Sequence, residues 1–356
     1  MIINLVLCLV INFFIIIFFN VSNKRNYFLD KVSKDHAIHQ DKIYKLGALI
    51  ILIDLLTVFI FYSEYFTPDV KSIITYSLLV LFVGGYEDLK ATDRFTWRFI
   101  LTIIISICFV LLNNFYIYNL NLGVKWIDTI FINSIFLKFI VTIFCLNTIM
   151  HAFNFLDGVN GNLSFYIIIL LLSIFSILKI ENFFYGDLKF LWQVGIFLIL
   201  LIIIFNFPKP KIFIGDGGAY FFGFYISALL IYMSHTISFE KISIWYYANL
   251  MIFPFTEVFI SFFRRIFFNK KKPTSADNKH MHHLIYNNLI SFNFKKKLEN
   301  NTLNSTTAII MMFVYAPSII LNTKFYSNPF FLKMIFYGSF IFFITIYMIL
   351  YRTIKK

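Results

Sequence analysis

Apolar runs of about 20 residues recur along the whole sequence, and a helix of about that length is needed to cross a bilayer. With 60% hydrophobic and 14% charged residues, the chain is too apolar for a soluble domain of its length. The sequence therefore predicts an all-α polytopic membrane protein, a single domain over residues 1–356. About eleven transmembrane segments are expected, at residues 1–20, 46–63, 71–86, 97–114, 131–150, 163–180, 190–207, 217–234, 243–263, 306–322 and 330–350.

The distribution of basic residues predicts the topology. Loops after the odd-numbered segments contain clusters such as Lys24-Arg25 and Lys270-Lys271-Lys272, whereas the opposite loops contain few Lys or Arg. Because basic loops stay in the cytoplasm, we expect the N-terminus outside and the C-terminus in the cytoplasm. The net charge of +13 is then explained by these loops, and no nucleic-acid partner is expected. The first apolar run lacks a preceding basic region and a cleavage site, so we expect an uncleaved first span.

The polar motifs all fall in the expected cytoplasmic loops, at about residues 21–45, 87–98, 151–162, 207–217 and 264–305. In the first loop, His39 and Lys45 suit either anionic lipid headgroups or a bound phosphate. In the second loop, Glu87 and Asp88 end an apolar segment, and Arg98 follows. Adjacent carboxylates either pair with nearby basic residues or share a cation, and Mg²⁺ binds one or two carboxylates plus substrate phosphates.

The third motif, residues 151–161, contains His151, Asn154, Asp157 and Asn160. Its Asp-Gly and Asn-Gly pairs are typical of a turn between helices. Amide and carboxylate side chains gathered at a helix end also suit recognition of nucleotide or sugar hydroxyl groups. Both interpretations remain open for this motif alone.

The fourth motif places Asp216 between glycines, with Lys211 upstream. Glycine lets a ligand approach the backbone closely, and the N–H groups of the next helix could receive a phosphate. The alternative is that Asp216 caps this helix. Capping and metal binding need not exclude one another.

The fifth motif contains His280, His282 and His283 in a basic loop. No cysteine or further ligand lies at the usual spacing for zinc, so contacts with phosphate or sugar are favoured over a metal site.

Together, these motifs resemble those of the polyprenyl-phosphate N-acetylhexosamine-1-phosphate transferases, the MraY- and WecA-like superfamily. The similarity runs from His39 to Tyr286 and includes Glu87-Asp88-Leu89, residues 151–161, Gly215-Asp216 and His280-Met281-His282-His283. Asn160 and Gly217-Gly218-Ala219-Tyr220 are closer to the WecA-type O-antigen subgroup. The sequence departs from the family pattern at His151, where the family usually has Asn.

The resemblance implies transfer of a sugar 1-phosphate from a UDP-N-acetylhexosamine to undecaprenyl phosphate, with release of UMP, at the bacterial cytoplasmic membrane. It implies a surface-polysaccharide pathway and Mg²⁺ dependence, with Mn²⁺ as an alternative. Membrane lipids are further expected partners, and a homodimer remains an open alternative. The competing functions are a secondary transporter and a catalytically inactive family member.

The resemblance also implies a role for each motif. It assigns catalysis to Glu87, Asp88 and Asp216, and metal binding to Asp216 and Asp88. It assigns nucleotide binding to Asn154, Asp157, Asn160 and Lys211. It assigns phosphate or sugar binding to His39, Lys45, Arg98, His280, His282 and His283.

Overall fold

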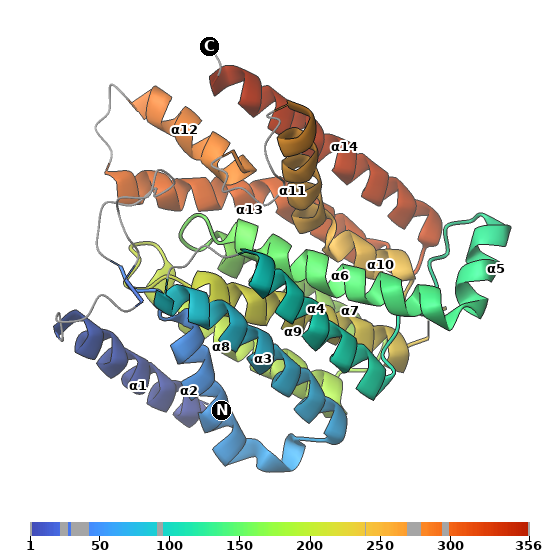
Figure 1. The fold of residues 1–356 in the computed structure, drawn as a ribbon, viewed down its shortest axis with the longest axis horizontal. Coiled ribbons are helices and arrows are strands. Elements are labelled where there is room, and N and C mark those ends of the chain that lie inside the picture. The colour runs from blue at the N-terminus through green and yellow to red at the C-terminus, as the bar shows by residue number, and fades with distance from the viewer. Residues whose placement is uncertain are drawn as a thin grey trace.

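The computed structural model describes residues 2–21, 28–29, 43–90, 95–238, 240–268, 279–293 and 299–354. These residues form a bundle of helices (Figure 1), and strand-like pairing among them is limited to the isolated bridges Leu29–Tyr44 and Tyr44–Ile212. The expected all-α membrane fold is confirmed. The helices are α1 (Ile2–Val21), α2 (Gly47–Tyr62), α3 (Pro68–Lys90), α4 (Phe95–Asn113), α5 (Lys125–Asn133), α6 (Ile135–Leu156), α7 (Asn162–Ile180), α8 (Gly186–Asn206), α9 (Gly215–Thr236), α10 (Ile244–Leu250), α11 (Ile252–Phe263), α12 (Met281–Asn293), α13 (Asn300–Lys324) and α14 (Pro329–Ile354), with a 3₁₀ turn η1 (Ser63–Tyr65) and a π-helical turn η2 (Arg264–Phe268).

Nine helices in the described part are long and apolar enough to cross a membrane. They correspond to nine of the expected segments, and several extend beyond the predicted ends, as α3 does at residues 68–90. The first expected segment appears as the shorter apolar stretch Leu5–Asn20 of α1. The loop expected at 151–162 begins inside α6, and the loop expected at 264–305 contains α12.

The ninth expected segment, 243–263, is divided into α10 and α11 at Met251. Pro254 explains the break, because proline has no N–H to donate to the carbonyl four residues earlier. That carbonyl belongs to Leu250, and it accepts a hydrogen bond from the Tyr166 hydroxyl instead. The free backbone acceptor is therefore satisfied inside the bundle, as a membrane environment requires.

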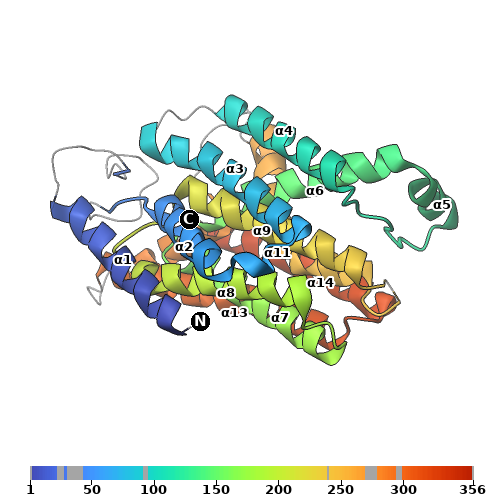
Figure 2. The same cartoon turned by 90° about the horizontal axis from the view of Figure 1, so that it is seen from below.

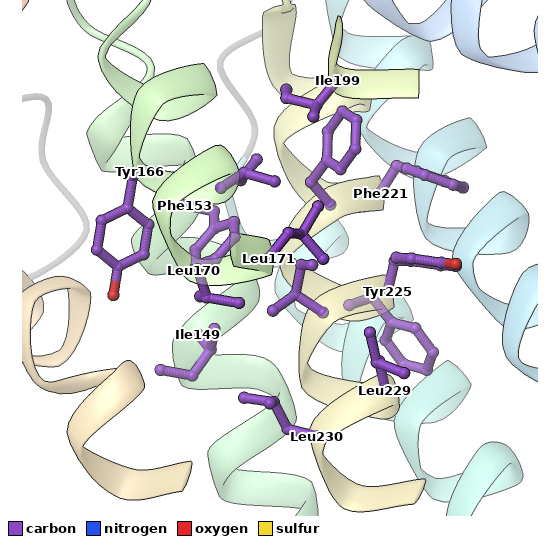
Figure 3. Packing of buried hydrophobic residues seen from close by; sticks show 14 of the residues in the cluster. Ile149, Phe153, Tyr166, Leu170, Leu171, Ile199, Phe221, Tyr225, Leu229 and Leu230 are labelled. Atoms are coloured by element: carbon purple, nitrogen blue, oxygen red, sulfur yellow. The ribbon is translucent and has the colours of Figure 1, made fainter. Parts of the chain in front are cut away.

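Helix α9 lies at the centre of the bundle and packs against α2, α3, α6 and α8 (Figures 1 and 2). In the apolar stretch of α9, 94% of the residues are buried. In the apolar stretch of α14, at the edge of the bundle, the share is 11%. Figure 3 shows α9 side chains packed among residues of α6, α7 and α8; the labelled ones are Phe221, Tyr225, Leu229, Leu230, Ile149, Phe153, Tyr166, Leu170, Leu171 and Ile199. Such a buried helix can present its N-terminal residues in a fixed position.

Helices α3 and α9 approach each other backbone to backbone. A Cβ atom added to Gly84 would lie 2.5 Å from the Asp216 carbonyl oxygen, and one added to Gly217 would lie 2.8 Å from the Gly85 nitrogen. Only glycine permits this separation. The close approach brings the last turn of α3, with Glu87 and Asp88, against the first turn of α9.

Candidate active site

The Asp88 carboxylate caps the N-terminus of α9 from the neighbouring helix α3. Its Oδ1 accepts a hydrogen bond from the Asp216 N–H at 3.0 Å, and its Oδ2 accepts one from the Gly217 N–H at 2.9 Å. The Lys45 Nζ lies 3.7 Å from Asp88 Oδ1. First-turn N–H groups have no acceptor within their own helix, and a carboxylate is the acceptor that the helix dipole favours. Asp88 therefore fixes α9 relative to α3.

Asp157 provides the next acceptor at the same helix end. It follows α6, and its Oδ2 accepts a hydrogen bond from the Gly215 N–H at 3.0 Å. Desolvation raises the pKa of the Asp157 carboxyl well above its usual range, and the nearby charges of Asp88 and Asp216 act in the same direction. The third and fourth motifs are thus joined by a direct contact.

These contacts correct one expectation for the fourth motif and exclude its alternative interpretation. The N–H groups of residues 215–217 donate to Asp157 and Asp88, so they are not open to a phosphate in this structure. Asp216 does not cap α9, because its carboxylate points to another partner. The N-terminus of α9 is capped instead by Asp88 of α3 and Asp157 of the turn after α6, and both residues are distant from α9 in the sequence.

Arg98 is the partner of Asp216 and links it to Glu87. Its Nη1 donates a hydrogen bond to Asp216 Oδ2, and its Nε lies 3.9 Å from Glu87 Oε2. The Asp216 side chain is 20% exposed, whereas that of Glu87 is 6% exposed. Asp216 is therefore the more accessible of these two carboxylates.

The turn at residues 157–161 is held by two asparagines that the sequence did not assign to the site. The Asn160 N–H donates to Asn304 Oδ1 of α13, and the Gly161 N–H donates to Asn206 Oδ1 at the end of α8, both at 2.7 Å. The Asn160 side-chain Nδ2 is buried and has no partner among the described residues. The side chain of Asn154 is half-buried, with no hydrogen bond to a described residue. Of these two amides, the half-buried one of Asn154 retains donors and an acceptor for a ligand.

The histidine motif lies against this turn. The ring centroids of His282 and His283 are 4.3 Å apart, and His280 stacks on His282 at 5.7 Å. A Cβ atom added to Gly158 would lie 1.9 Å from His282 Nε2, so glycine is needed for this contact. Burial lowers the pKa of His282 well below its ordinary value, and its histidine neighbours add to the effect.

Glu257, a buried carboxylate of α11, holds the start of α12. Its Oε2 lies 3.3 Å from His280 Nδ1, and its Oε1 accepts a hydrogen bond from the Met281 N–H at 3.2 Å. The sequence analysis missed this residue. The available signal was a lone carboxylate inside an apolar segment, which is costly unless it has a task.

Some expected residues lie apart from this cluster. Lys211 is exposed, and its side chain contacts none of the described carboxylates. His39 lies outside the described residues. His151, the departure from the family pattern, has Nε2 3.4 Å from the Thr102 hydroxyl and packs edge-on against Tyr220 at 5.1 Å. It therefore lies between α4 and α9, beside the helix that carries Arg98.

The carboxylates at this end offer oxygen ligands only, which suit Mg²⁺ or Mn²⁺ rather than a soft metal. No group of three His, Cys, Asp or Glu side chains among the described residues is arranged as a complete metal site. Mg²⁺ does not require one, because it commonly uses one or two carboxylates together with substrate phosphates and water. Asp216 fits such a role best, since its oxygens accept no backbone N–H.

Comparisons with known proteins found a related family and one curated relative. The sequence model of the family described as glycosyl transferase family 4 matches residues 70–234. Residues 70–234 are therefore similar to glycosyl transferase family 4. The expected resemblance to the MraY- and WecA-like superfamily is confirmed over these residues, and the WecA-type subgroup stays a prediction.

A curated relative is similar to part of the chain. It is the undecaprenyl-phosphate alpha-N-acetylglucosaminyl 1-phosphate transferase of Thermotoga maritima, 34% identical over 137 residues. The match covers 38% of this chain and 38% of the relative. The family 4 segment runs from α3 to α9 and includes the paired carboxylates, Arg98, the 151–161 motif and Asp216. The histidine motif and Lys45 lie outside it.

Proposed function

We propose that this chain transfers a sugar 1-phosphate from a UDP-N-acetylhexosamine to undecaprenyl phosphate and releases UMP. The observation that carries the proposal is the convergence of Glu87, Asp88, Asp157 and Asp216 with Arg98 and Lys45 at one end of a membrane bundle. The similarity to an undecaprenyl-phosphate alpha-N-acetylglucosaminyl 1-phosphate transferase supports the same chemistry. The reaction would be the initiating step of a surface polysaccharide at the cytoplasmic face of a bacterial membrane.

The reaction requires alignment and charge neutralisation more than covalent help from the protein. A phosphate oxygen of the lipid attacks the β-phosphorus of the UDP-sugar. The bond between that phosphorus and the bridging oxygen breaks, and the oxygen leaves with UMP. Glu87 and Asp88 would position the lipid phosphate, and Arg98 and Lys45 would offset the phosphate charge.

Asp216 would hold Mg²⁺ or Mn²⁺, with Asp88 as a second ligand through lone pairs that its N–H donors leave free. When bound, the metal would stabilise the negative charge of the diphosphate and of the UMP leaving group. Asn154, Asp157, Asn160 and Lys211 would contact the nucleotide. His280, His282 and His283, at the start of α12, would contact phosphate or sugar, and so would His39.

The test uses purified protein, undecaprenyl phosphate and UDP-GlcNAc labelled in the sugar and its attached phosphate. We expect label in a lipid pyrophosphate and release of UMP, with loss of both on chelation of divalent metal. The variant Asp216→Asn should lower turnover at least roughly 100-fold, as expected for a group that stabilises transferring phosphate charge. Asp128→Asn, in α5 at the other end of the bundle, serves as the matched control.

The competing functions predict other results in the same assay. A transporter would accumulate intact UDP-sugar in vesicles without forming UMP, and an inactive family member would do neither. Near-normal turnover by Asp216→Asn would refute the metal assignment. Replacing UDP-GlcNAc with other UDP-N-acetylhexosamines then identifies the sugar.

A further inference from the structure

Glu257 is a buried carboxylate to which the proposed reaction gives no task. It lies in α11, and its side chain is 2% exposed. Its two oxygens have different partners at the start of α12. Oε1 accepts a hydrogen bond from the Met281 N–H at 3.2 Å, and Oε2 lies 3.3 Å from His280 Nδ1. Because a backbone N–H can only donate, the first contact fixes Oε1 as an acceptor.

The second contact determines where His280 carries a proton. A carboxylate oxygen only accepts hydrogen bonds, so Nδ1 must donate to Glu257 Oε2. An unprotonated Nδ1 would place its lone pair against that oxygen. The Ser261 hydroxyl oxygen lies 3.2 Å from the same Nδ1 and can accept from it as well. Because the hydrogen bond at one ring nitrogen sets the state of the other, Nε2 is the atom left for a ligand.

The His280 ring borders the motif at residues 151–161, where it packs against Phe155 with a centroid distance of 4.6 Å. The His280 side chain is 7% exposed, and its Nε2 has no hydrogen-bond partner among the described residues. Both ring nitrogens of His282 are fully enclosed, whereas Nε2 of His280 is not. Of these two histidines, His280 is therefore the more accessible to a substrate.

A second helix supports the same segment through the backbone. The Tyr347 hydroxyl of α14 donates a hydrogen bond to the Lys279 carbonyl oxygen at 3.0 Å, and Tyr347 is buried. This bond holds the residue before His280 but involves no atom of the His280 ring. Glu257 and Tyr347 therefore both stabilise the start of α12, and the contact with the ring proton belongs to Glu257.

We propose that Glu257 is a positioning residue for His280. It keeps a proton on Nδ1 and so leaves Nε2 to contact the phosphate or sugar of the UDP-N-acetylhexosamine. The contact with substrate rests on the proposed function, whereas the position of the proton does not. Glu257 acts through the histidine, because its own carboxylate is enclosed and both of its oxygens have partners.

Glu257→Gln tests the proton position with a side chain of the same shape. The Met281 N–H still requires an acceptor, so the amide oxygen takes the place of Oε1 and the NH₂ group faces His280 Nδ1. Nδ1 must then accept, and the ring carries its proton on Nε2. The measurement is ¹⁵N NMR of the full chain, labelled in histidine and purified in detergent. We expect a protonated Nδ1 in the wild type and an unprotonated Nδ1 in Glu257→Gln.

The His280 signals are identified by their absence from the spectrum of His280→Gln. The matched control is Tyr347→Phe, which removes a hydrogen bond from the same segment and should keep the proton on Nδ1. The proposal would be overturned by an unprotonated Nδ1 in the wild type or by a protonated Nδ1 in Glu257→Gln. Loss of the Nδ1 proton in Tyr347→Phe would also overturn it. These measurements require no turnover, so they are independent of the proposed reaction.

The transfer assay tests the consequence for the substrate. Glu257→Gln should lower kcat/KM for UDP-GlcNAc roughly 10- to 100-fold, the range typical of removing a group that orients a metal-bound histidine. Glu257→Gln combined with His280→Gln should be as active as His280→Gln alone, because Glu257 acts through that ring. Additive losses, or an unchanged kcat/KM in Glu257→Gln, would refute the positioning role. Absence of transfer by the wild type would refute the proposed function, and the NMR result would still decide the proton position.

Discussion

Asp88 and Asp216 are both acidic residues at one helix junction, yet their environments differ. Asp88 is buried and accepts two backbone N–H groups of α9, whereas Asp216 is partly exposed and pairs with Arg98. The first contact holds two helices together, and the second leaves a carboxylate that is 20% exposed at the same helix end. One carboxylate therefore has a structural task in addition to any chemical one.

Substitution of these two residues by asparagine should separate the tasks. Asp88→Asn replaces one acceptor oxygen by a donor that faces an N–H group, so we expect a loss of stability of about 1–3 kcal/mol. Asp216→Asn should abolish UMP release with a much smaller change in the melting temperature in detergent. An unchanged melting temperature for Asp88→Asn would contradict the capping role.

Gly158 should tolerate no side chain. In Gly158→Ala the added Cβ would lie 1.9 Å from His282 Nε2, so the buried histidine must move and the start of α12 with it. We expect a loss of stability of about 1–3 kcal/mol, as for an overpacked core position, and lower transfer activity. Gly338→Ala in α14 is the matched control, because its Cβ would have nothing within 4 Å. Equal melting temperatures for the two variants would show that His282 has no fixed position.

At the scale of elements, α1 is joined to α2 by a buried polar pair. The Asn12 Nδ2 lies 3.2 and 3.1 Å from the two Asp54 carboxylate oxygens, and both residues are 0% exposed. The Cys8 and Thr57 side chains make a second polar contact at 2.9 Å. Polar pairs inside a membrane bundle favour one register between helices, because any other register leaves the groups unsatisfied.

A double substitution should reveal this pairing. Asn12→Leu alone leaves the buried Asp54 without its donor, so we expect a loss of about 1–3 kcal/mol. Asn12→Leu combined with Asp54→Leu removes both groups and should recover most of that loss. The measurement is thermal unfolding in one detergent. The pairing would be contradicted if the double variant lost as much stability as the single variants Asn12→Leu and Asp54→Leu lose together.

At the scale of the whole molecule, hydrogen bonds and ion pairs bring the polar motifs to one end of the bundle. The opposite end carries α5 and the loop between α9 and α10 (Figures 1 and 2). Confinement of these groups to one end fits an enzyme whose nucleotide substrate is on one side of the membrane.

The orientation of the bundle can be tested by labelling single cysteines in a variant without native cysteines. Asp128→Cys, at a half-buried position of α5, and Lys211→Cys, at an exposed position, place thiols at opposite ends of the bundle. Because basic loops remain in the cytoplasm, a membrane-impermeant maleimide should label Asp128→Cys in intact cells. Lys211→Cys should be labelled only after permeabilisation. The reverse pattern would refute the expected topology.

The amino-acid sequence by itself determined the membrane class, the approximate helices and the ends at which the motifs lie. These properties depend on local composition, because an apolar run of sufficient length forms a helix whatever its neighbours are. Pro254 also indicates the interruption of the ninth segment at Met251, although the sequence analysis did not predict that interruption. The residue types of the site were likewise visible in the sequence as polar groups in an apolar chain.

Only the tertiary structure decided what each polar group contacts. Asp88 and Gly217 are 129 positions apart, and Asn160 and Asn304 are 144 apart. Their pairing depends on how closely helices pack, as at Gly84 and Gly217, and no local pattern specifies such a distance. For the same reason, the capping of α9 by Asp88 and Asp157 and the support of α12 by Glu257 followed from packing alone.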